Sequence, residues 1–340
     1  MAEHHPPVTP FSISPSCSAS ELVARMAGTS FQARNLARGA EIWGRMLAGE
    51  VTIFFGLAGA MVPAGMRQVM VYLIQNRLID CLVSTGANLV HDVHETLGRC
   101  HWQGQATADD EELARRKINR IHDVFLPERE LDQTEEFIAR FSSSLPQDQA
   151  YSTGEYLFLL GRELSSCGEE EGILSAAAKA DIPIYCPALG DSILGTALAG
   201  LRVGQGKHLY FDIVKDVVEM IQLVSSAKSS GVIFIGGGTP KNFIQQAALY
   251  GYLFGKEPRG HEYAIQITTD SPHWGGLSGC TFEEAHSWNK VAPQALTVTI
   301  NSDATIALPI LVSALAESSA ESIKDRRKPV FHLARGVGAL

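Results

Sequence analysis

Basic residues are scarce in this chain. Its 340 residues include 28 Lys and Arg against 37 Asp and Glu, which gives a formal net charge of −9. An acidic surface gives no electrostatic support to nucleic-acid binding, so we expect no nucleic-acid partner. One basic run, KDRRK at 324–328, does occur, and we expect it to be solvated.

Paired cysteines and long apolar runs are also missing. The six cysteines are scattered without CxxC spacing, and two lie in the apolar runs LIDCLV and IYCPAL, where cysteine acts as a small hydrophobic residue. This pattern favours a reduced, cytoplasmic setting. The N-terminal MAEHHPPVTPFSISPS lacks the basic and apolar regions of a signal peptide. No unbroken apolar run reaches the ~18 residues of a membrane span, so we expect no membrane segment.

Short apolar runs alternate with helical patterns along most of the chain. Helical spacing is present at 31–47 and over a long stretch at about 107–165. The strand-like runs begin the segments 51–65, 79–87, 182–191, 208–214, 231–240, 263–270 and 296–304. The alternation predicts an α/β fold: a doubly wound, mostly parallel, Rossmann-like sheet with helices on both faces and added N-terminal helices. We expect residues 1–18 to be flexible, 19–318 to form a single domain and 319–340 to form a charged tail.

The segments that follow the predicted strands are rich in small residues. They read GLAGA, STGAN, ALGDS, GGGTP, TTDSP and NSDAT. Ligands of such sheets bind at the carboxyl ends of the strands. Small residues there let backbone amides approach a phosphate, and an Asp can bind ribose hydroxyls. No G-x-G-x-x-G or Walker lysine pattern is present, so each segment alone is typical of a tight turn or helix cap. Together the six favour a nucleotide or dinucleotide.

A lysine beside a tryptophan raises a second question. In GCTFEEAHSWNKV (279–291), Lys290 follows Trp288 and an acidic turn. It is either an ordinary surface lysine or a nucleophile. A lysine nucleophile must be unprotonated, and the reference pKa of lysine is about 10.4, so it needs desolvation or a cationic neighbour.

This segment resembles the active-site segment of deoxyhypusine synthases, in which a lysine follows a Ser-Trp-Gly triplet. Six further segments resemble the family in the same order and look closest to its archaeal and bacterial branch. They are FQARNLARG, TIFFGLAGAMVPAGMR, LVSTGANLVHD, IPIYCPALGDSILG, GGGTPKNFI and NSDATIALPILV. The resemblance identifies 19–318 as an NAD-binding catalytic domain of this kind.

The resemblance implies an NAD-dependent transferase. The family takes a 4-aminobutyl group from spermidine, carries it as an imine on a lysine and passes it to an acceptor amine. The acceptor is either a lysine of the precursor of translation factor 5A, giving deoxyhypusine, or a free diamine such as putrescine, giving homospermidine. The resemblance also implies a homotetramer, a dimer of dimers. The alternatives are a catalytically silent or regulatory NAD-binding homologue and an amine dehydrogenase without transfer.

The resemblance implies a role for each residue of this chain that matches a functional position of the family. Lys290 is the predicted nucleophile, Glu284 would hold a substrate ammonium, and Trp288 would exclude water and stack on the cationic chain. Glu283 is expected to be solvated. The other predicted substrate residues are His91, Asn242, Trp274 and Gly275. The predicted NAD residues are Gly59, Ala60, Thr85, Gly86, Ala87, Asp191, Gly237, Thr269, Asp270, Asp303 and Ala304. Helix capping is the alternative for Asp191 and Asp303.

Departures from the family pattern cluster at the polyamine end. Eukaryotic members carry two glutamates where this chain has Val90 and His91, an aspartate at Thr196, a histidine at Asn242 and a glycine at Asn289. Buried ammonium groups need paired charge, so the identity of the donor and of the acceptor is in question.

The spacing of His91 and His94 is also compatible with two metal ligands on one face of a helix. A third ligand at motif spacing is missing. We therefore expect no metal.

Overall fold

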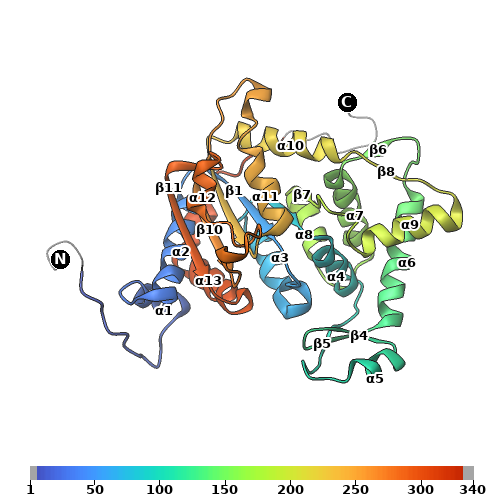
Figure 1. Ribbon diagram of the computed structural model, residues 1–340, viewed down its shortest axis with the longest axis horizontal. Helices are drawn as coiled ribbons and strands as arrows, with labels where there is room; N and C mark the ends of the chain where they lie inside the picture. Colours follow the sequence, from blue (N-terminus) through green and yellow to red (C-terminus); the bar gives the residue numbers. More distant parts are fainter. Residues whose placement is uncertain (1–5, 332–340) are drawn as a thin grey trace.

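Six parallel strands form the central sheet (Figure 1). The computed structural model describes residues 6–331. The strands are β1 (Val51–Leu57), β2 (Cys81–Ser84), β7 (Ile184–Tyr185), β9 (Ser229–Ile235), β10 (His261–Thr268) and β11 (Val291–Asn301). Their order is β11-β10-β9-β1-β2-β7, so the chain builds outward from β1 in one direction and then from β9 in the other. This is the strand order of dinucleotide-binding sheets, and it confirms the predicted fold class.

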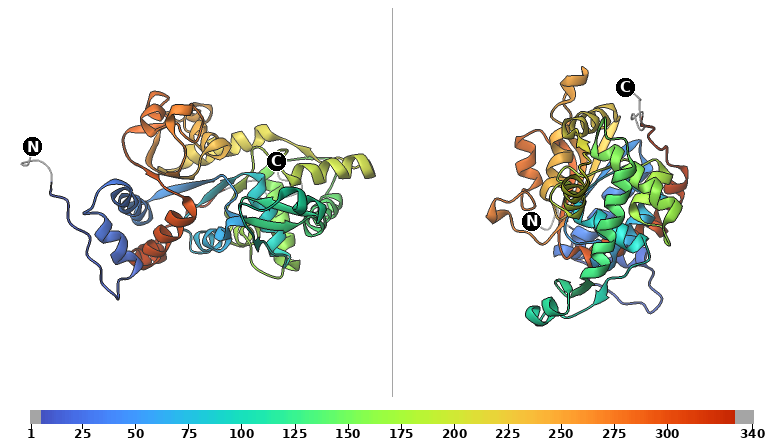
Figure 2. Two further views of the ribbon diagram at one scale, coloured as in Figure 1. Left: turned by 60° about the horizontal axis from the view of Figure 1, so that its bottom comes forward. Right: turned by 90° about the vertical axis from the view of Figure 1, so that its right-hand side faces the viewer.

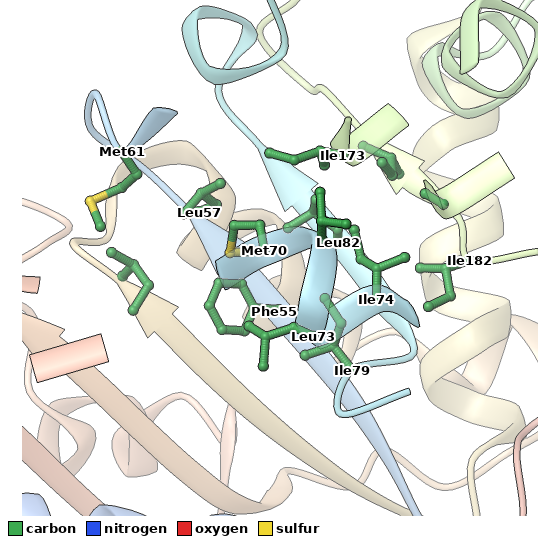
Figure 3. Close-up of a cluster of buried hydrophobic side chains, with 14 of the residues drawn as sticks. Phe55, Leu57, Met61, Met70, Leu73, Ile74, Ile79, Leu82, Ile173 and Ile182 are labelled. Carbon is green, nitrogen blue, oxygen red and sulfur yellow. The ribbon is translucent and has the colours of Figure 1, made fainter. Parts of the chain in front are cut away.

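Alternate residues of β1 enter two separate cores. Ile53, Phe55 and Leu57 pack with α2 and α13 in the larger cluster, whereas Phe54 packs with α10, α11 and α12 in the smaller one. All seven residues of β1 are buried, as a strand covered on both faces requires. Figure 3 shows the larger cluster around Phe55, and Figure 2 shows helices on both sides of the sheet.

Several of the described helices begin at residues whose side chains cap them. Ser18 and Ser152 form capping boxes with the glutamates three residues later, and Asp109, Asp212 and Thr281 accept hydrogen bonds from backbone amides of the first turn. The helices are α1 (Ala19–Met26), α2 (Phe31–Ala48), η1 (Val62–Met66), α3 (Arg67–Gln75), α4 (Gly86–Thr96), α5 (Asp110–Arg115), α6 (Glu128–Ser144), α7 (Thr153–Cys167), α8 (Ile173–Ala180), α9 (Ile193–Gln205), α10 (Ile213–Ser226), α11 (Gly238–Ala247), η2 (Gly251–Phe254), η3 (Pro272–Trp274), α12 (Phe282–Ser287), α13 (Ala304–Ser318) and α14 (Ala320–Asp325).

Two predictions of secondary structure were wrong. The stretch at 107–165 is not continuously helical, because α5 is followed by a hairpin, β4 (Ile118–Ile121) and β5 (Val124–Pro127), which β3 (Trp102–Gln103) extends. His122 turns this hairpin with a φ of 54°, and its β-branched flanks favour strands. The run at 208–214 gives only β8 (Tyr210–Phe211), which pairs with β6 (Ala150–Tyr151) outside the central sheet.

The C-terminal basic run is partly buried. Lys324, Arg327 and Lys328 are exposed, but Arg326 is 6% exposed and forms an ion pair with Asp80 whose side chains are both fully buried. Arg326 also donates to the backbone oxygens of Arg77 and Val51. The expectation of a solvated run is therefore wrong at this one position, and α14 is tied to the start of β1.

The ends of the chain extend beyond the described part. The predicted flexible segment 1–18 and charged tail 319–340 include residues 1–5 and 332–340, which lie outside it. Within 6–331, no helix combines the length and apolar character needed to cross a bilayer.

Candidate functional site

All six predicted small-residue segments follow strands of the central sheet. Because the strands are parallel, their carboxyl ends meet at one edge. The direction in which the chain adds strands to the sheet reverses between β1 and β9. The backbone N–H of Ala58, just after β1, donates to Ile235 O at the end of β9 (3.1 Å). The two segments that carry Gly59, Ala60 and Gly237 therefore lie side by side at the switch point.

Asn88 joins two of these segments and was missed by the sequence reasoning. Its side-chain amide donates to Gly59 O (2.9 Å) and to Thr85 Oγ1 (3.2 Å), and its Oδ1 accepts from the N–H of Val62 (3.2 Å). The side chain is fully buried. The asparagine in STGAN, just before the predicted helix, was the available signal, and the structure includes it in the first turn of α4.

Glycine is required at several of these turns. Gly59 and Gly238 have φ values of 78° and 55°, a region that other residues rarely adopt. A Cβ on Gly86 would lie 2.3 Å from Ser192 Oγ, and one on Gly237 would lie 2.5 Å from Ser278 Cα. Backbone thus approaches closely here, as a bound phosphate also requires, and α4, α11 and α13 begin at this edge with their N-termini. These features fit a dinucleotide.

The three predicted aspartates have different roles in the fold. Asp303 is the N-cap of α13, where it accepts from Thr305 N (2.7 Å) and Oγ1 (2.6 Å), and these bonds lower the pKa of Asp303. Asp191 is exposed and does not cap α9, because Ser192 holds that position. Asp270 accepts from Ser271 N (2.9 Å).

A cleft of about 430 Å³ opens beside Asp270 at the β10–β11 end of the same edge. Thr268, Ser278, Asn301 and Arg38 are among its lining residues. Arg38 comes from α2, so an N-terminal helix completes this part of the edge. The cleft adds the ends of β10 and β11 to the switch-point segments as possible ligand contacts.

Lys290 follows α12, and its side chain reaches α11. Its backbone oxygen accepts from His261 N (3.1 Å) at the amino ends of β10 and β11. Lys290 therefore does not lie at the carboxyl ends of the strands, where the small-residue segments are. Its Nζ donates to Asn242 Oδ1 (3.1 Å) and lies 5.4 Å from the ring centroid of Trp288. Asn242 is four residues into α11, about 6 Å along the helix from the carboxyl edge. The amine is thus about one helical turn from the segment that carries Gly237.

The structure brings together Lys290, Trp288 and Asn242 from the predicted set. Trp288 is 60% exposed, and its ring lies on one side of the Lys290 amine. Glu284 and Glu283 are exposed in the first turn of α12. Burial raises the pKa of Cys280, and the carboxylate of Glu284 raises it further, so Glu284 acts on Cys280 although it is exposed.

Asn289 explains one departure from the family pattern. Its φ is 55°, in the left-handed region. Glycine adopts this conformation freely, and Asn is among the few other residues that tolerate it. The turn that presents Lys290 is therefore compatible with Asn in place of the family glycine.

Lys241 was also missed. It is 2% exposed, and its Nζ donates to Gln266 Oε1 (2.9 Å) and to Cys280 O (2.5 Å). Burial lowers the pKa of Lys241 to about 8, while Glu284 opposes and Lys290 adds to this effect. The Nε2 of Gln266 donates to Gly236 O and Ser278 O, both at 2.7 Å. The buried pair of Lys241 and Gln266 therefore holds the residues that follow β9 against the segment before α12. A lone Gln in the apolar run YAIQIT was the available signal.

His91 belongs to a different group of side chains. It lies on α4, which Figure 1 shows apart from α12, and its Nδ1 is 2.9 Å from His101 Nε2. The described residues contain no cluster of three or more His, Cys, Asp or Glu arranged to hold a metal ion. Trp274 is 79% exposed, and Gly275 ends the short helix η3 with a φ of 66°. Contacts of all these residues with ligands stay predictions.

Comparisons with known proteins give a consistent result. The sequence model of the family described as "DS: Deoxyhypusine synthase" matches residues 21–315. "Probable deoxyhypusine synthase 2" of Methanosarcina acetivorans is 48% identical over 316 residues, which cover 92% of this chain and 90% of the relative. A "Deoxyhypusine synthase-like protein" of Chlorobaculum parvum is 36% identical over 295 residues, 85% of this chain and 84% of the relative. The fold matches the crystal structure of a "putative deoxyhypusine synthase" from Entamoeba histolytica with a TM-score of 0.66 at 20% identity, covering 91% of this chain and 94% of that one.

Proposed function

This chain belongs to the deoxyhypusine synthase family, and we propose that it is an NAD-dependent transferase that moves the 4-aminobutyl group of spermidine through an imine on Lys290 to an acceptor amine. The observation that carries the proposal is the placement of Lys290 Nζ between Trp288 and Asn242. Within residues 6–331, the amine has one hydrogen-bond acceptor, an aromatic ring on one side and a buried cation, Lys241, nearby.

The residues at the carboxyl edge fit the cofactor. The chemistry that NAD supplies when bound is removal of hydride from the carbon beside the secondary amine of spermidine, and its later return. The glycine turns at Gly59 and Gly237 and the start of α4 at Gly86 would hold the pyrophosphate. Thr85, Ala87, Asp270, Asp303 and Ala304 flank them at the same edge, and a carboxylate there suits ribose hydroxyls. Asp191 and Thr269 complete the proposed set, with Ala60 beside Gly59.

Lys290 performs the covalent step. Its unprotonated amine adds to the imine carbon of oxidised spermidine, and the C–N bond to 1,3-diaminopropane breaks as that product leaves with the proton. The aminobutyl group is then held as an imine on Nζ. An acceptor amine adds to the same carbon, Lys290 leaves as the free amine, and the product imine is reduced.

Asn242 and Trp288 orient this amine. The Oδ1 of Asn242 accepts one N–H of Nζ, which directs the lone pair, and the Trp288 ring can stack on the cationic chain of the substrate. Glu284, in the first turn of α12, offers a carboxylate to a substrate ammonium. We assign Trp274, Gly275 and His91 to the outer part of the polyamine path, which would need a second chain or a rearrangement to meet Lys290.

The acceptor is either a free diamine such as putrescine or a lysine of translation factor 5A. The negative net charge suits a cationic polyamine and a basic protein equally. The loss of family carboxylates at Val90 and Thr196 changes the charge that faces the polyamine. The proposed assembly is a homotetramer, a dimer of dimers.

Trapping the covalent intermediate tests the proposal. The purified protein is incubated with NAD and spermidine, with and without putrescine, and reduced with borohydride. Mass spectrometry then maps any aminobutyl adduct, and the same samples are analysed for 1,3-diaminopropane and homospermidine. We expect an adduct on Lys290 that Lys290→Ala lacks and that the exposed-lysine control Lys179→Ala retains.

The products separate the remaining possibilities. Homospermidine that appears only with putrescine identifies a diamine acceptor. An adduct without homospermidine, together with label transfer to a translation factor 5A precursor, identifies a protein acceptor. Free NADH without an adduct would indicate an amine dehydrogenase. Neither adduct nor diaminopropane would refute transfer from spermidine and favour a silent NAD-binding homologue.

A further inference from the structure

Three side chains on and beyond α4 form a hydrogen-bonded chain whose two histidine side chains are buried and whose glutamate is half-buried. His101 Nδ1 lies 2.7 Å from Glu95 Oε1, and His101 Nε2 lies 2.9 Å from His91 Nδ1. His91 is 8% exposed, and the side chain of His101 is 6% exposed. Arg67 approaches the other oxygen of Glu95 at 3.6 Å. Such buried chains have a restricted set of hydrogen positions because every donor needs an acceptor.

The order of donors and acceptors follows from the carboxylate. Glu95 can only accept, so His101 Nδ1 must carry the proton that it donates. In a neutral His101 ring, Nε2 is then an acceptor, and the proton of the 2.9 Å bond must come from His91 Nδ1. Burial, with His101 and His94 nearby, lowers the pKa of His91 to about 3, so the ring of His91 is neutral.

The outward nitrogen of His91 is then left as a bare acceptor. Within the described residues, Nε2 of His91 makes no hydrogen bond, and it is not sealed from solvent as Nε2 of His94 is. We infer that Glu95 and His101 are positioning residues that hold His91 in the Nδ1–H tautomer, so that its Nε2 accepts a hydrogen bond from an ammonium or amine N–H of the substrate. This inference rests on the proposed function for its ligand, a polyamine.

The arrangement explains how a neutral ring can select a cation. A lone pair at Nε2 accepts from an ammonium and repels a carboxylate or phosphate oxygen. The charge of Glu95 polarises the chain through His101, although Arg67 offsets part of that charge. His91 therefore supplies acceptor character at a position where eukaryotic relatives have a glutamate.

Tautomers can be measured without turnover. Protein labelled with ¹⁵N only in histidine is studied by long-range ¹H–¹⁵N correlation, with His91→Asn and His101→Asn used to assign the signals. We expect pyrrole-type Nδ1 and pyridine-type Nε2 on both rings of the wild type. A pyrrole-type Nε2 on His91 would overturn the inference, since the ring would then present a donor.

The ligand role of His91 and the effect of Glu95 through His101 are tested on the same labelled protein. Spermidine should shift the Nε2 signal of His91, whereas succinate should not, and an unmoved signal at saturating spermidine would refute the ligand role. Glu95→Gln should mix the tautomers of both rings, and unchanged tautomers would refute the relay. In turnover, Glu95→Gln should raise KM for spermidine about tenfold with little change in kcat, since the affected hydrogen bond is to a charged group.

A matched substitution and the adduct experiment complete the design. Glu112→Gln changes an exposed glutamate paired with Arg115 and should leave both tautomers and KM unchanged. Absence of an adduct on Lys290 would refute the proposed transfer and leave the tautomer result standing. Expected tautomers without a spermidine shift would refute the inference and leave the transfer standing.

Discussion

Replacing Lys241 by methionine tests the electrostatics of the site most directly. Lys241 is 2% exposed, and among the described residues its ammonium donates to neutral oxygens of Gln266 and Cys280. Burial lowers the pKa of Lys241 from 10.5 to about 8. Methionine keeps the apolar stem without a titratable group, so the stability difference between wild type and variant reports the proton equilibrium of this lysine together with its coupling to Cys280.

The sign and size follow from proton linkage. The folded pKa lies below the unfolded one, so between pH 8 and 10.5 the unfolded chain binds more protons and stability rises with pH. One pKa unit corresponds to about 1.4 kcal/mol. From pH 7 to pH 10, the wild type should therefore gain about 2 to 3 kcal/mol relative to Lys241→Met.

Urea unfolding followed by tryptophan fluorescence at pH 7, 8, 9 and 10 measures this difference. Groups that do not interact with Lys241 contribute equally to both proteins and cancel, whereas the pKa of Cys280, which Lys241 lowers, differs between them. The same series on Lys256→Met, an exposed lysine, provides the baseline. A difference that stays constant across the series, or that moves in favour of the variant, would show that Lys241 is not buried as a charge.

Two further substitutions test the fold around the site. Asn289→Ala should cost about 1 kcal/mol of unfolding free energy because of the left-handed φ of 55°, and Asn289→Gly should stay within about 0.5 kcal/mol of wild type. Equal losses in both variants by urea unfolding would contradict this reasoning. Arg326→Met should cost about 3 to 5 kcal/mol because it leaves Asp80 buried without its partner, and Arg326→Met combined with Asp80→Leu should recover part of that loss. A loss below about 1 kcal/mol for Arg326→Met alone would show that the pair is not sealed.

Local pattern was a good guide where burial on both faces dictates composition. The run VTIFFGL is apolar apart from Thr52 because it lies between two helical layers, and its strand was predicted from this composition. The same reasoning failed at HLYFDIV, where only Tyr210 and Phe211 are in a strand. Side-chain chemistry gives no information on which strand a short apolar run will pair with, and here the partner is β6.

The site was predicted unevenly. Lys290, Trp288 and Asn242 come from two segments whose resemblance to a family could be read directly, and the structure places them together. Gln266 and Lys241 were overlooked because single polar residues in apolar or helical runs look like tolerated exceptions. Their importance comes from pairing with each other across β10 and α11, a contact between residues 25 apart.

By itself, the sequence determined the six strands, the small residues that follow them and the family segments that carry Lys290, because these depend on neighbours along the chain. Only the tertiary structure decided that Arg326 is buried against Asp80, that Asn88 ties Gly59 to Thr85, and that Glu95 reaches His91 through His101. Burial and hydrogen-bond partners are properties of packing between distant segments. The free energy of a buried polar group depends on those partners, which local sequence does not specify.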